Sequence, residues 1–129
     1  MTLFELNKIV DSNDLVFVRF QKPLCVPCRM LTAEIDKLIS RGYDKKVFIV
    51  NVSMNESDEL VKEFEINLAP SMLLFKNGFQ CEKIVGFRTA DFIADTIDKY
   101  IDWFIYNMLS LLIINLTRVC NFLILIGLI

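Results

Sequence analysis

The segment VFVRFQKPLCVPCRML, residues 16–31, contains two of the chain's four cysteines, Cys25 and Cys28, with two residues between them. It opens with a run of apolar and β-branched residues that suits a buried strand, except for Arg19. After the second cysteine, apolar residues recur at the spacing of one helix face, and Gly42 can end that helix. The cysteine pair therefore lies between a buried strand and the first turn of a helix.

Two thiols at this spacing can bind a metal or exchange electrons. If Cys25 is the N-cap and Cys28 lies one turn later, both sulfurs share one helix face and can form a disulfide. The free N–H groups and the positive end of the helix dipole favour a thiolate at Cys25. Pro27 falls in the first turn, where its missing N–H costs nothing. We therefore expect Cys25 to be the exposed nucleophile and Cys28 the shielded thiol that resolves the mixed disulfide.

The composition excludes some classes of function. A net charge of −2 and a pI near 5.1 argue against nucleic-acid binding, because no basic stripe can neutralise phosphates. Residues 1–14 include Glu5, Asp11 and Asp14 and have no continuous apolar core, so they cannot form a secretory signal. We therefore expect a cytoplasmic, reducing location, where a CxxC pair indicates redox or metal chemistry.

Helices and strands alternate along the rest of the chain. From apolar spacing, capping residues and turn residues we predict a helix at 2–11, a strand at 15–20, the helix after the cysteines, a strand at 46–52, a helix opened by the capping-box pair Ser53 and Glu56, a hairpin at 69–87 around Asn77-Gly78, and a helix capped by Thr89. This order, αβαβαββα, predicts an α/β fold with a central four-stranded mixed sheet flanked by helices.

The cysteine segment, followed by NLAPSMLLFKNG (67–78) and VGF (85–87), resembles the thioredoxin family over roughly residues 3–102. The resemblance implies a thioredoxin-like fold and a thiol–disulfide oxidoreductase that reduces protein disulfides. It also implies that Cys25 attacks, that Cys28 resolves, and that the Ala69–Pro70 bond is cis. The expected partners are protein disulfide substrates and a thioredoxin-reductase-type electron donor. The substrate-binding residues that it implies lie around the cysteines: Leu24, Val26, Pro27, Ala69, Pro70 and Gly86.

The sequence departs from the family pattern at several positions. Leu24 stands where the family usually has Trp, Val26 where it has Gly, and Ala33 where it has a helix-kinking Pro. The family's first strand is also missing, which would leave four strands. Arg19 occupies the place of the buried Asp that helps to move a proton from the resolving thiol. A cation there could stabilise the Cys28 thiolate and tune the redox reaction, or it could extend to the sheet edge away from the sulfurs.

Two other functions compete with disulfide exchange. The chain could be a redox-inactive thioredoxin-fold module that binds polypeptides. It could also be a cysteine metal-binding protein, but zinc normally needs four ligands and the chain has no histidine. Cys81 and Cys120 would have to complete such a site. We therefore predict no metal and no other cofactor.

Residues 103–129 form a separate apolar segment with a single charged residue, Arg118. A helix of this length extends about 40 Å, enough to cross a bilayer with some tilt. We predict a domain at 1–102 and a hydrophobic C-terminal helix at 103–129 that holds this domain on the cytosolic side of a membrane. Because Arg118 would be costly inside a bilayer, an oligomerisation helix or a tail added by a change of reading frame are the alternatives.

Overall fold

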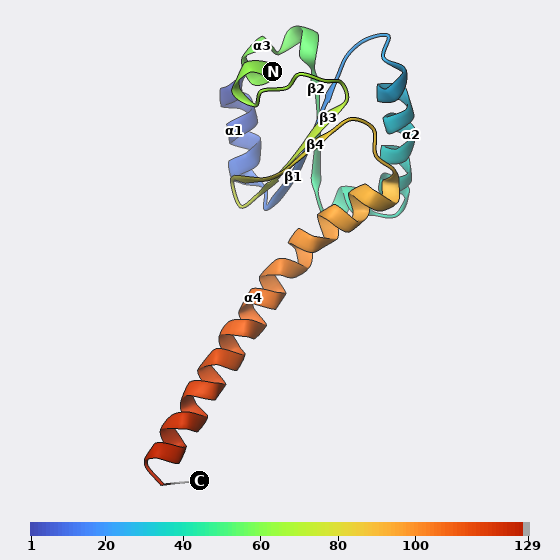
Figure 1. Ribbon diagram of the computed structural model, residues 1–129. Coiled ribbons are helices and arrows are strands. Elements are labelled where there is room, and N and C mark those ends of the chain that lie inside the picture. The colour runs from blue at the N-terminus through green and yellow to red at the C-terminus, as the bar shows by residue number, and fades with distance from the viewer. Residues whose placement is uncertain (128–129) are drawn as a thin grey trace. The chain divides into compact units, whose positions relative to one another are not determined.

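The computed structural model describes residues 1–127, without the side chains of 103–106. The chain divides into two compact units, residues 1–97 and residues 98–129. The helices are α1 (Leu3–Ser12), α2 (Val26–Ser40), α3 (Asp58–Glu63) and α4 (Ala90–Leu125), with two 3-10 turns, η1 (Tyr43–Lys45) and η2 (Met54–Glu56). The strands are β1 (Leu15–Gln21), β2 (Phe48–Ser53), β3 (Ser71–Lys76) and β4 (Phe79–Val85). The predicted order, αβαβαββα, is confirmed (Figure 1).

The four strands form one mixed sheet in the order β2-β1-β3-β4. β1 is parallel to β2 and antiparallel to β3, and β3 is antiparallel to β4. β1 therefore has a hydrogen-bonded neighbour on each side. Figure 1 shows α1 and α3 on one side of the sheet and α2 on the other.

The alternation of side chains along β1 divides the core into two layers. Val16, Val18 and Phe20 belong to a cluster that also contains Leu6 from α1 and Leu60 from α3. The intervening residues of β1, Phe17 and Arg19, point to the opposite face. That face is covered by α2 and by the first turns of α4, which bury Leu31, Ile35, Leu38, Ile93 and Ile97.

The predicted end of α2 and the predicted hairpin turn both contain residues with a left-handed backbone conformation. Gly42 has φ 87° and donates its N–H to the carbonyl of Ile39 at 2.9 Å, so α2 ends as predicted. Asn77 and Gly78 both have positive φ, 49° and 85°, which a tight hairpin turn between β3 and β4 requires. Both predictions are confirmed.

The predicted capping box at Ser53 and Glu56 is wrong. Ser53 is still the last residue of β2, where it pairs with Gln21, and its side chain makes no capping hydrogen bond. The capping box lies instead at the start of α1. The Thr2 hydroxyl accepts a hydrogen bond from the Glu5 N–H at 3.2 Å, and the Glu5 carboxylate accepts one from the Thr2 N–H at 2.8 Å.

The predicted strand at 46–52 begins two residues later than expected. The N–H groups of Lys46 and Val47 both donate to the carbonyl of Tyr43, at 2.9 Å each. These two residues therefore complete the η1 turn before β2 starts at Phe48.

The start of α4 is fixed by two side chains. The Thr89 hydroxyl accepts a hydrogen bond from the Phe92 N–H at 3.3 Å, as the predicted cap requires. Glu34 of α2 accepts a second one from the Ala90 N–H at 2.7 Å and forms an ion pair with Lys37 at 2.8 Å. The Lys37 hydrogen bond, followed by that from Ala90, lowers the pKa of Glu34.

Residues 98–125, in the second unit, are helical, and most of their described apolar side chains are exposed. By length and composition alone, α4 contains a stretch that could cross a membrane. The chain thus has an apolar C-terminal helix that could serve as an anchor. Residues 128–129 of the predicted tail lie outside the described residues.

Candidate active site

Cys25 and Cys28 lie where β1 leads into α2. Cys25 is the N-cap of α2, with an extended backbone (φ −105°, ψ 109°), and Pro27 lies in the first turn. The two cysteines are joined by a disulfide, and their Cα atoms are 5.2 Å apart. The Cys25 sulfur also accepts the Cys28 N–H at 3.2 Å, so it occupies the place of an N-cap oxygen. The helix terminus thus supplies a donor and a positive dipole end to this sulfur.

The two cysteines differ in their access to solvent. Cys28 is only 4% exposed, whereas Cys25 is half-buried. Only Cys25 can be reached easily by a second protein, which is the asymmetry that disulfide exchange through a mixed disulfide needs.

A second loop faces the cysteines. The Cys25 sulfur lies 3.9 Å from the carbonyl oxygen of Ala69, and the Ala69–Pro70 peptide bond is cis, as expected. The buried Pro70 accepts a hydrogen bond at its carbonyl from the Gly86 N–H at 2.8 Å. The structure therefore links the loop before β3 to the one after β4, next to the disulfide.

Apolar side chains surround this opening. Leu24 is 98% exposed and Val26 is 57% exposed, beside the cysteine that solvent can reach. Leu24 also has a positive φ of 55°, which is uncommon for a residue other than glycine. Leu68, next to Ala69, is 52% exposed and was missed by the sequence reasoning. Its position directly before the Ala-Pro pair was the available signal.

Arg19 is buried on the α2 side of the sheet, with 7% of its surface exposed. Its Nε donates to the side-chain oxygen of Asn51 on β2 at 2.9 Å, and a terminal guanidinium nitrogen donates to the Thr32 hydroxyl at 2.9 Å. That hydroxyl in turn donates to the carbonyl of Cys28 at 3.1 Å. The side chain extends toward the edge strand β2, yet it remains connected to the backbone of Cys28 through Thr32.

Burial lowers the pKa of Arg19, and the charge of Asp36 partly offsets this effect. An arginine starts from so high a pKa that it stays charged at neutral pH. Sequence reasoning missed Asn51 and Thr32 as partners of Arg19. The spacing of Thr32, one helical turn after Cys28, was the only available signal.

The disulfide does not involve the other two cysteines, Cys81 and Cys120. The half-buried Cys81 donates from its sulfur to the carbonyl of Leu74 on the neighbouring strand at 3.3 Å, and Cys120 is exposed on α4. No group of three or more histidine, cysteine, aspartate or glutamate side chains that could hold a metal ion occurs within the described part of the chain.

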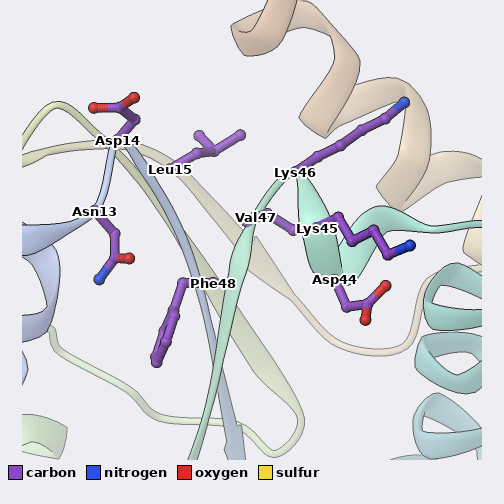
Figure 2. A pocket seen from close by; sticks show the side chains of 8 residues that line it. All are labelled: Asn13, Asp14, Leu15, Asp44, Lys45, Lys46, Val47 and Phe48. Carbon is purple, nitrogen blue, oxygen red and sulfur yellow. The ribbon is translucent and has the colours of Figure 1, made fainter.

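A pocket of about 240 Å³ lies at the start of β1 (Figure 2). Its walls are the start of β1, the η1 turn and the start of β2: Asn13, Asp14, Leu15, Asp44, Lys45, Lys46, Val47 and Phe48. Because the cysteines follow the other end of β1, this pocket is not part of the cysteine site.

The family model described as Thioredoxin matches residues 3–99. A chloroplastic M-type thioredoxin from Chlamydomonas reinhardtii is 32% identical over 74% of this chain and 68% of its own length. A thioredoxin from Synechocystis sp. is 32% identical over 72% of this chain and 86% of its own length. The crystal structure of mitochondrial thioredoxin 3 from Saccharomyces cerevisiae, in its oxidised form, superposes with a TM-score of 0.70 at 28% identity, covering 76% of this chain and 90% of the yeast chain.

These similarities agree with the geometry of the Cys25–Cys28 pair, and they do not favour a redox-inactive module or a metal site. Residues 3–99 carry both the fold and the cysteine pair of a thiol–disulfide oxidoreductase, and the chain belongs to the thioredoxin family.

Proposed function

We propose that Cys25 is the nucleophile of this oxidoreductase and that Cys28 is its resolving thiol. The Cys25 thiolate of the reduced protein attacks one sulfur of a client disulfide, forms a mixed disulfide and releases the other client sulfur as a thiolate. The Cys28 thiolate then attacks Cys25, which releases the second client thiol and leaves the Cys25–Cys28 disulfide. Two electrons pass from the protein to the client.

One observation supports these roles above all others. The sulfur at the helix N-cap, that of Cys25, is the more exposed one, while Cys28 is 4% exposed. An N-terminal helix dipole stabilises the thiolate that solvent can reach, and burial reserves the second thiol for the intramolecular step.

The client would bind across the opening between the two loops. We assign Leu24, Val26, Pro27, Ala69, Pro70 and Gly86 to this substrate-binding surface. The exposed side chains of Leu24 and Val26 offer apolar contacts beside the attacking sulfur. The carbonyl of Ala69, 3.9 Å from that sulfur, offers a backbone acceptor to an extended client segment.

Reduction of insulin disulfides tests this assignment. Cys25→Ser should abolish turnover, and Cys28→Ser should accumulate a mixed disulfide with insulin, seen as a shifted band on a non-reducing gel. Cys81→Ser is the matched control and should behave as wild type. Equal turnover in wild type and Cys25→Ser would exclude Cys25 as the nucleophile.

Repeated reduction needs a source of electrons. The Cys25–Cys28 disulfide would be returned to the dithiol by a reductase of the thioredoxin-reductase type, which transfers two electrons through its own reduced redox group. Purified reductase of this type, supplied with its reductant, should restore insulin reduction over many cycles. Turnover that occurs only with dithiothreitol would argue against this donor.

We further propose that residues 103–129 anchor the domain at 1–102 to a membrane, with the domain in the cytoplasm. The apolar side chains of the tail, such as Leu111, Ile113 and Leu116, are between 61% and 64% exposed. A bilayer would cover them at a gain of about 25 cal/mol per Å². An oligomerisation helix is the main alternative.

Phase separation in a detergent with a cloud point distinguishes the anchored form from a free one. The full chain should enter the detergent phase, and a chain ending at Asp102 should stay in the aqueous phase. If both stay in the aqueous phase, the anchor is refuted. A concentration-dependent oligomer of the full chain in water would support the oligomerisation helix.

A further inference from the structure

We infer that the buried charge of Arg19 activates Cys28 for the resolving step, in place of a general base. This inference rests on the roles proposed above for the two cysteines. Arg19 is a positioning residue here, because it acts through Cys28 and does not touch the client.

The contacts of Arg19 place its charge beside the first turn of α2. The guanidinium is two hydrogen bonds away from the carbonyl of Cys28, through the Thr32 hydroxyl, at 2.9 Å and 3.1 Å. It is also held in place by Asn51, at 2.9 Å. Because it is only 7% exposed, solvent and salt screen its field weakly.

The charged groups around Cys28 leave Arg19 as the dominant buried charge. At the register of Arg19, the neighbouring strands contribute Asn51 and Met72, which are uncharged. The facing loop contributes Ala69 and Pro70, which are also uncharged. On α2 itself, Arg29 and Asp36 are exposed, and their opposite charges are more strongly screened by water.

The Cys25 sulfur is neutral once it is part of the mixed disulfide, so it does not repel a second thiolate. Near the start of α4, Asp91 is bound to Arg41 by a 2.8 Å ion pair. Asp36 acts on Arg19 from an exposed position, so it opposes the field of Arg19 only in part.

This field acts on the second half of the reaction. In the mixed disulfide, the Cys28 thiol loses its proton to solvent, and the resulting thiolate attacks Cys25 with release of the client thiolate. A buried cation linked to the Cys28 backbone through one hydroxyl raises the fraction of Cys28 that is thiolate at neutral pH. Intrinsic nucleophilicity falls as the thiolate is stabilised, with a Brønsted slope of about 0.4–0.5. A tenfold gain in thiolate fraction therefore gives a net gain of about threefold in rate.

The resolving rates of wild type and of a variant without the charge should therefore depend differently on pH, so that their two pH profiles meet or cross at high pH. At pH 7, loss of the charge should slow resolution, because less Cys28 is thiolate. At a pH above both titration midpoints, Cys28 is thiolate in every variant. There the variant without the charge should resolve as fast as wild type or faster, because its thiolate is more basic.

The test follows the resolving step directly. The full chain, in non-ionic detergent and in a Cys81→Ser, Cys120→Ser background, is reduced and mixed with the aromatic disulfide of thionitrobenzoate. Attack by Cys25 releases the first thionitrobenzoate at a rate that depends on reagent concentration. Attack by Cys28 releases the second at a rate that does not. The absorbance of the second phase is recorded from pH 5 to pH 11, a range of about six units that spans the ordinary thiol midpoint.

Arg19→Gln removes the charge but keeps a hydrogen-bonding amide, and Arg19→Lys keeps the charge. In the Gln variant, the rate of the second phase at pH 7 should be at least about threefold lower than in wild type. The midpoint of its pH profile should lie at higher pH, and at high pH its rate should equal or exceed that of wild type. The Lys variant should keep a midpoint near that of wild type. If Arg19→Gln does not fold, Arg19→Met replaces it.

Thr32→Val separates charge from hydrogen bonding, because it breaks the connection to the Cys28 carbonyl and leaves the guanidinium in place. Its midpoint should stay near that of wild type. A midpoint displaced as far as in Arg19→Gln would overturn the assignment to charge. So would equal profiles for wild type and Arg19→Gln, or a uniform slowing at every pH. Failure of the first phase in wild type would instead refute the proposed role of Cys25.

Discussion

Leu24 combines a strained backbone with a side chain that packs against almost nothing. Its φ is 55° and its side chain is 98% exposed. For an L-residue, this left-handed conformation costs about 1–2 kcal/mol. Glycine adopts it freely, but it also gains about 0.4–1 kcal/mol of freedom in the unfolded chain. We therefore expect Leu24→Gly to raise the free energy of unfolding by about 0.5–1 kcal/mol.

This stabilisation should be accompanied by weaker binding of clients. If a client covers about half of the Leu24 side chain, glycine should cost about 1 kcal/mol of binding, or about fivefold in kcat/KM for insulin. The two effects have opposite signs because the strain belongs to the folded domain and the contact belongs to the complex. Leu24 would then be a residue at which stability is given up for function.

Urea unfolding of the full chain in non-ionic detergent, followed by circular dichroism, measures the first effect. Met30→Gly is the matched control, because Met30 is 52% exposed in the helical part of the same segment. There glycine should lower the free energy of unfolding by about 0.8–1 kcal/mol. If Leu24→Gly is destabilised as much as Met30→Gly, the reasoning from backbone strain is wrong.

Three further predictions concern the stability of the domain. Phe20→Ala should lower the free energy of unfolding by about 3–5 kcal/mol in the same urea assay, because Phe20 is fully buried and its ring lies 6.4 Å from that of Phe64; a loss below about 1 kcal/mol would contradict the observed packing. Thr2→Ala should cost about 1 kcal/mol through loss of the capping box, and Thr2→Ser, which keeps the hydroxyl, should restore most of it. Glu34→Gln should be less stable than wild type at pH 7, because a lowered pKa of Glu34 stabilises the folded state at pH values above the ordinary pKa of 4.5. This stability is lost as the pH falls through the pKa of Glu34 in the folded protein. If the variant shows the same slope of stability against pH below pH 4.5 as wild type, this role of Glu34 is refuted.

The sequence predicted the features whose causes are local. Asn77-Gly78 and Gly42 were sufficient to predict the hairpin turn and the end of α2, because each of these turns needs a positive φ at those positions. The mixed character of the sheet also followed from the succession of elements, because a strand, a helix and a second strand join in a parallel pair and a hairpin adds an antiparallel one. The cysteine pair was placed at the N-terminus of α2 by the same kind of local reasoning.

Features that depend on strand register were not available from the sequence. Asn51 lies beside Arg19 because β1 and β2 pair in one register among several that the apolar pattern allows. The false capping box at Ser53 has a similar cause. Its residue types satisfy the capping pattern, but pairing with β1 keeps Ser53 extended, and local spacing does not report that pairing.

The central position of β1 has a consequence for hydrogen exchange. The β1 amide protons that face β3 lie inside the sheet, so they should exchange only when the sheet opens as a whole, whereas β2 and β4 can open locally at the two edges. The cysteine loop begins at the end of this inner strand. Local opening of either edge strand would therefore leave the end of β1, which holds the cysteine loop, in place. The site should remain ordered until the domain unfolds as a whole.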